Sequence, residues 1–93
     1  EGVTVNGSID AAVIREQGVV FAVVAVKPHV LNEPEKRAAA VGELRAALGQ
    51  PLIVLMSQDN RGKATFWGRS DLVRFLSRVP TSAMPWKRYR RAA

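Results

Sequence analysis

Eight consecutive apolar residues, Val19-Val20-Phe21-Ala22-Val23-Val24-Ala25-Val26, lie between Gly18 and Lys27-Pro28. The run is rich in β-branched residues, has no helical period and is too short to cross a membrane. Glycine and proline punctuate its two ends, and Pro28 cannot donate a hydrogen bond to a strand ladder. This pattern predicts a strand that is buried on both faces at the centre of a parallel or mixed sheet.

The clearest helix of the chain is expected after this strand. His29-Val30-Leu31 is predicted to be a connection, and Asn32 to be the N-cap. Glu35, three residues later, completes a capping-box pattern, while Pro34 suits the first turn. Gly49 is expected to end the helix, since glycine is the preferred residue at that position. The apolar stripe at helical spacing comprises Ala40, Val41, Leu44, Ala47 and Leu48.

The second half of the chain predicts a hairpin followed by a helix. Residues 52–56 form another apolar run, residues 58–62 have turn chemistry, and residues 63–67 alternate as a half-exposed strand. Ser70 is predicted to cap a last helix, which Pro80 terminates. Residues 81–93 show no periodicity and are interpreted as a basic C-terminal tail that follows a single domain of residues 1–80.

Two interpretations of the N-terminal region remain open. Val3-Thr4-Val5 is predicted to be a short strand, and Asn6-Gly7 is a favourable turn dipeptide. The next residues either return as the second strand of a hairpin or form a short helix that Ser8 or Asp10 caps and that ends near Gln17. The helix is favoured here, because most of these residues have good helix propensity.

The fold class that follows is a single three-layer α/β domain with a mixed four-stranded sheet and helices on both faces. Its order, β-α-β-α-β-β-α, resembles the thioredoxin-like fold over roughly residues 19–79, and the hairpin alternative gives β-β-α-β-β-α. The resemblance rests on Gln50-Pro51-Leu52-Ile53-Val54-Leu55 and Phe66-Trp67-Gly68-Arg69-Ser70-Asp71-Leu72, where a proline precedes the strand and a glycine precedes the last helix. The redox cysteines of that superfamily would fall near residues 6–9 and are absent. The resemblance therefore implies a protein-interaction domain without redox activity.

Composition excludes several kinds of chemistry. The 93 residues include no cysteine, which rules out disulfides, thiolate metal sites and cysteine nucleophiles. With one histidine and no glycine-rich phosphate loop, we expect neither a metal ion nor a cofactor. No apolar run approaches the length of a membrane-spanning helix. A cysteine-free chain is compatible with the reducing cytoplasm, which we take as its expected location.

The charge of the chain is concentrated at its C-terminal end. Residues 1–60 hold five basic and seven acidic residues, whereas residues 61–93 hold nine basic residues against Asp71 alone. Such asymmetry indicates an anionic partner, either nucleic acid or an acidic protein. The alternative is an arginine-rich surface that is only solvated.

Two segments combine cations with aromatic residues. Strand geometry puts Lys63, Thr65 and Trp67 on one face, with Arg69 just beyond, as in surfaces that track single-stranded nucleic acids. In residues 85–91, cations are interleaved with Trp86 and Tyr89. This combination suits contacts with phosphate groups and stacking on bases. The alternative is that these aromatic residues are packed into the domain. The predicted anion-binding residues are Lys63, Trp67, Arg69, Arg74, Arg78, Trp86, Lys87, Arg88, Tyr89, Arg90 and Arg91.

A hydrolytic site is the weaker hypothesis. If strands 19–26 and 52–56 are parallel neighbours, His29, Ser57 and Asp59 emerge at one edge of the sheet, where α/β sites commonly lie. They would then serve as base, nucleophile and orienting group. In the thioredoxin-like arrangement strand 52–56 runs antiparallel and the three residues separate. Because no nucleophile-elbow motif is present, we expect a binding module rather than an enzyme.

Overall fold

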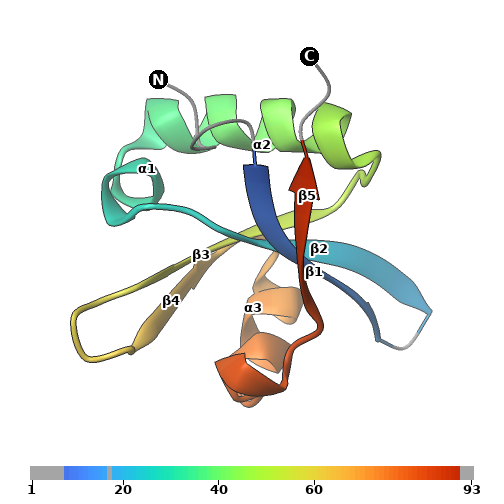
Figure 1. The fold of residues 1–93 in the computed structure, drawn as a ribbon, viewed down its shortest axis with the longest axis vertical. Coiled ribbons are helices and arrows are strands. Elements are labelled where there is room, and N and C mark those ends of the chain that lie inside the picture. The colour runs from blue at the N-terminus through green and yellow to red at the C-terminus, as the bar shows by residue number, and fades with distance from the viewer. Residues whose placement is uncertain (1–7, 17, 91–93) are drawn as a thin grey trace.

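Residues 8–16 and 18–90 together form a five-stranded mixed sheet with helices on both faces (Figure 1). The computed structural model describes residues 8–16 and 18–90. Strand order across the sheet is β4-β3-β2-β1-β5. The elements are β1 (Ser8–Glu16), β2 (Val19–Ala25), α1 (Pro28–Asn32), α2 (Pro34–Leu48), β3 (Ile53–Gln58), β4 (Ala64–Trp67), α3 (Ser70–Leu76), a 3₁₀ turn (Thr81–Ala83) and β5 (Trp86–Arg90).

The central strand is confirmed. β2 lies in the middle of the sheet, antiparallel to β1 and parallel to β3. Its side chains alternate between two cores: Ala22 and Val24 face α1 and α2, whereas Phe21 and Val23 face α3. All four are at most 1% exposed, as a strand covered on both faces requires.

Figure 1 shows the helices that cover these two cores, with α1 and α2 on one side of the sheet and α3 on the other. Helix α2 ends as predicted at Gly49, whose φ of 66° is left-handed and whose N–H is donated to the carbonyl of Arg45. Of its predicted stripe, Ala40 and Leu44 are buried, while Ala47 is exposed. None of the helices formed by residues 18–90 is long and apolar enough to cross a membrane.

The favoured helix over residues 8–17 is wrong and the strand alternative is correct, because residues 8–16 form β1. Its small and β-branched residues supply two apolar series at a period of two, with Ile9 and Ala11 in one core and Ala12 in the other. Pairing with strands on both sides overrides the local helix propensity of the alanines. Gly18, with φ of 80°, lies in the turn to β2. The predicted strand and turn over residues 3–7 lie outside the described residues.

The predicted helix starts also differ from the structure. Residues 29–31, expected to be a connection, belong to α1, because Pro28 fits a first helical turn and the core buries Val30 and Leu31. Asn32 ends α1 and does not cap α2; its N-cap is Glu33, which Pro34 holds in extended conformation and whose side chain accepts no capping hydrogen bond. Likewise Ser70 is the first residue of α3, and Arg69 is its N-cap.

The sheet has five strands rather than the expected four, because residues 86–90 of the predicted tail form β5 beside β1. Trp86 packs against the α3 core and Tyr89 against the α2 core, so the strand is anchored on both faces. The domain expected to end at residue 80 thus extends to residue 90. The resulting order, β-β-α-α-β-β-α-β, differs from the order that the thioredoxin-like resemblance implies. The resemblance itself stays a prediction.

Candidate nucleic-acid interface

Trp67 is the most unusual residue on the surface. It ends β4, at one edge of the sheet, and its side chain lies on the same face as α1 and α2, opposite to Ala64 and Phe66 and in contact with Arg37 of α2. At 38% exposure it is the one exposed large hydrophobic residue among those that the structure describes. The predicted alternation of the strand is confirmed, since Ala64 and Phe66 pack into the α3 core while Thr65 and Trp67 are exposed.

Arg37, in the first turns of α2, holds this indole ring in place. Its guanidinium carbon lies 4.9 Å from the ring centroid, and one Nη donates a hydrogen bond of 3.1 Å to the carbonyl of Leu31 at the end of α1. The Nε atom is buried and has no hydrogen-bond partner among the described residues. The π-electrons of the ring are therefore the nearest compensation for its desolvation. Arg37 thus connects α1, α2 and β4 at one point.

Lys63 precedes β4 on the same side as Thr65, at the end of the β3–β4 hairpin. This turn is formed as predicted: the Asp59 carboxylate accepts hydrogen bonds of 2.9 Å from the backbone N–H groups of Arg61 and Lys63. Gly62 supplies the left-handed φ of 82° that the turn requires. The exposed Lys63 is thereby fixed in backbone position. We call Arg37, Lys63, Thr65 and Trp67 the Trp67 surface.

The remaining predicted cations lie elsewhere. Arg69 is the N-cap of α3, and the exposed Arg74 and Arg78 lie on or just after this helix, which covers the opposite face of the sheet. The β5 residues, 86–90, lie at the far edge of the sheet, four strand spacings or roughly 19 Å from β4. Arg91 is outside the described residues. The predicted binding residues therefore do not form one strip.

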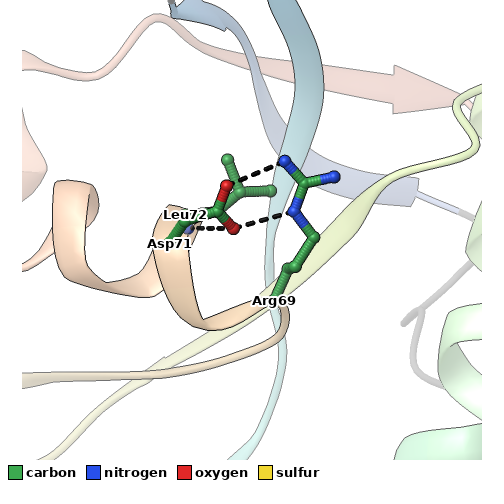
Figure 2. Close-up of polar contacts among 3 residues, drawn as sticks. All are labelled: Arg69, Asp71 and Leu72. Atoms are coloured by element: carbon green, nitrogen blue, oxygen red, sulfur yellow. Dashed lines mark hydrogen bonds and ion pairs between the residues drawn. The ribbon is translucent and has the colours of Figure 1, made fainter.

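Arg69 also has an acidic partner, as Figure 2 shows. Its Nε and Nη2 atoms donate hydrogen bonds of 2.7 and 2.8 Å to the two carboxylate oxygens of Asp71. One of these oxygens also accepts the backbone N–H of Leu72 at 2.9 Å. Much of the positive charge of Arg69 is thus balanced locally, which makes it a weaker phosphate ligand than Lys63.

This ion pair predicts an unusual titration. The hydrogen bonds from Arg69 lower the pKa of Asp71 from 3.8 to about 2. Since the folded-state pKa is lowered, the stabilisation from the pair is complete above the unfolded-state value and is lost as the pH falls through about 2. A carboxyl ¹³C titration should show the Asp71 midpoint near 2, and Arg69→Gln should return it toward 3.8. A midpoint that does not respond to this substitution would contradict the pairing.

The aromatic residues of β5 pack against the two cores and are not presented on the surface as Trp67 is. The Trp86 Nε1–H group donates a hydrogen bond of 2.9 Å to the carbonyl of Thr81, and its ring packs against the α3 core. Tyr89 is half-buried against the core beneath α2. Both are therefore poor stacking platforms for a base, and Trp67 is the better one.

The structure has the strand arrangement that the hydrolytic hypothesis requires, but not the side-chain geometry of a catalytic triad. β2 and β3 are parallel neighbours, so their carboxyl ends share one edge, near which α1 begins. Ser57 is 7% exposed and His29 lies on the surface of α1, but no hydrogen bond joins the two within residues 18–90. One carboxylate oxygen of Asp59 is occupied by the hairpin turn. These three residues are therefore not arranged as a catalytic triad.

Sequence reasoning missed Arg37. Arg37 does not belong to the apolar stripe of the predicted helix, and nothing in the local pattern indicates a contact with a tryptophan on a later strand. Comparison with known proteins adds no further assignment, because no protein-family model, curated protein or solved structure matches the chain.

Proposed function

We propose that this protein is a non-catalytic module that binds single-stranded nucleic acid through the Trp67 surface. The observation that carries the proposal is the exposed indole of Trp67, fixed in place by Arg37 on a strand at the sheet edge. A large apolar ring costs free energy when it is left in water. A nucleobase that stacks on it removes that cost without a sequence requirement, because every base has a π-face.

The charges around the ring fit the same ligand. Lys63 and Thr65 lie along the strand from Trp67, so a chain that stacks on the indole passes an exposed ammonium and a hydroxyl group. Lysine contacts phosphate as a point charge and threonine as a hydrogen-bond donor. Arg37 is half-buried, and its guanidinium group lies over the ring. Cytoplasmic nucleic acid is the expected ligand, consistent with a cysteine-free chain.

The test is fluorescence anisotropy with a labelled oligothymidine of about 12 nucleotides, titrated at two salt concentrations. We expect Trp67→Ala to weaken binding about 5- to 150-fold, the equivalent of about 1–3 kcal/mol for one stacked base, and Trp67→Phe to retain most of the affinity. Lys63→Gln should reduce the slope of log K against log salt by about 0.7, the value for one phosphate on a single strand.

Arg88→Gln, at the opposite edge of the sheet, is the matched control and should leave oligothymidine binding unchanged. Affinity that does not depend on salt would refute the proposal. So would Trp67→Ala protein that binds as well as the wild type, or a complete lack of binding at low salt.

The thioredoxin-like resemblance supports a different function, a protein-interaction domain with its contact near Pro51. This residue is exposed before β3, and its carbonyl accepts a hydrogen bond of 3.0 Å from the Nε of Arg45. A partner bound there should resist moderate salt and should be indifferent to Trp67→Ala. The same variant therefore separates the two functions.

A further inference from the structure

We infer that the outer edge of β5 is a second binding surface, which takes up an extended acidic segment of a partner protein as a sixth strand. Among the described residues, β5 is the last strand of the sheet, and β1 is the strand with which it pairs. In an antiparallel pair, alternate residues turn their backbone N–H and C=O groups away from the neighbouring strand. Within the part of the chain that the structure describes, no strand lies on that outer side.

The side chains of this edge are cationic on both faces of the sheet. The register places Lys87 opposite Ala11, on the α2 side, and Arg88 opposite Asp10, on the α3 side. Both are exposed, and Arg90 ends the strand. The Arg88–Asp10 ion pair has an N–O distance of 3.1 Å, but the Arg88 side chain is 74% exposed, so water screens the pair. Arg88 therefore stays available to a second carboxylate.

These charges discriminate between possible occupants of the edge. A second copy of β5 would bring lysine and arginine against lysine and arginine, which is unfavourable and is a common defence against edge-to-edge association. Nucleic acid has no backbone that continues a sheet ladder, and the aromatic residues here are packed into the cores. A strand with glutamate or aspartate opposite Lys87 and Arg88 can form the backbone hydrogen bonds of the sheet with β5 and can also pair with both cations.

The edge strand is also held rigidly enough to act as a template. Trp86 and Tyr89 insert into opposite cores, and the five-residue register with β1 is continuous from residue 86 to residue 90. A strand that is already ordered costs little conformational entropy when a partner adds to it. The new segment alone must become ordered, which suits a flexible acidic tail or loop.

The test is an NMR titration of the ¹⁵N-labelled 93-residue chain with a ten-residue peptide of valine, threonine and four glutamates. We expect shifts at the amides of residues 86–90, backbone NOEs between the peptide and β5, and slowed hydrogen exchange at the β5 amides that face outward. The counterpart peptide with lysine in place of each glutamate should not bind. The double substitution Lys87→Glu with Arg88→Glu should weaken the acidic peptide about tenfold or more.

Lys63→Gln is the matched control and should leave peptide binding unchanged, because Lys63 lies at the other edge of the sheet. Equal binding of the lysine peptide, peptide shifts centred on Trp67, or no binding at millimolar peptide would overturn the inference. Oligothymidine that shifts β5 amides and displaces the peptide would also overturn it, since the edge would then be a phosphate-binding surface. The mapping on wild-type protein does not depend on how well the double variant folds.

Discussion

A chain that ends at Pro85 is expected to be largely unfolded. The deletion removes β5 and with it Trp86, which packs into the α3 core, and Tyr89, which packs into the α2 core. It also exposes the flank of β1 to water, including Ala11 and Ala12, which are fully buried in the intact domain. Loss of one large aromatic residue from a core costs about 3–5 kcal/mol, and the strand pairing is lost as well.

The total free energy of unfolding of a domain of this size is on the order of 5–14 kcal/mol. We therefore expect the truncation to cost about 5 kcal/mol or more, enough to lose the cooperative transition or to lower its midpoint strongly. Urea unfolding followed by circular dichroism measures this loss. A chain that ends at Arg90 retains all of β5 and serves as the control. Identical midpoints for the two chains would show that β5 contributes nothing to the fold.

The truncation also determines how binding must be measured. If residues 86–93 were a dispensable basic tail, deleting them would be a simple test of anion binding. Because residues 86–90 are a strand of the sheet, a loss of binding after deletion would report unfolding. Point substitutions at exposed residues, such as Lys87, avoid this ambiguity.

Phe21→Ala is expected to be the most damaging single substitution among those considered. Phe21, near the start of β2, is completely buried and meets Phe75 of α3 edge-to-face, with ring centroids 6.5 Å apart and planes at 90°. Alanine would lose the transfer free energy of the ring, leave a cavity beneath α3 and remove the aromatic contact. We expect a loss of about 3–5 kcal/mol in the free energy of unfolding.

The matched control is Val20→Ala, the neighbouring residue on the same strand, which is only partly buried. It should cost about 1 kcal/mol or less. Both are measured by urea unfolding at constant m-value, so that the change in midpoint reports stability. Equal losses for the two variants would contradict the assignment of Phe21 to the α3 core.

The two proposed binding surfaces lie at opposite edges of one sheet and differ in chemistry. The β4 edge combines an exposed aromatic ring with a lysine, whereas the β5 edge combines cations with an open strand ladder. Their variants are therefore expected to act independently. Trp67→Ala should weaken oligonucleotide binding and leave peptide binding unchanged. Charge reversal at Lys87 and Arg88 should weaken peptide binding and leave oligonucleotide binding unchanged. Sites this far apart with no shared contacts usually give additive effects.

The parts of the fold that could be predicted are those whose signals lie within a few neighbouring residues. A run of apolar residues as continuous as 19–26 has to be covered on both faces, and the structure places it at the sheet centre. Gly49 and the Asp59–Gly62 turn mark the ends of α2 and β3, because left-handed backbone and side-chain-to-backbone hydrogen bonds are encoded within a few residues.

The two strands that flank this centre on one side, β1 and β5, depend on contacts between distant parts of the chain. The alanine-rich β1 suits a helix locally, and it becomes a strand because two neighbours pair with it. In β5 the cations that surround Trp86 and Tyr89 hide the apolar pattern of a strand. The two aromatic residues can be recognised as strand residues only when the two cores against which they pack are known. The Arg37–Trp67 contact joins a helix to a distant strand, so no local pattern contains it. Of the Trp67 surface, Lys63, Thr65 and Trp67 follow from the period of the strand, whereas Arg37 depends on this long-range contact and could be found only in the fold.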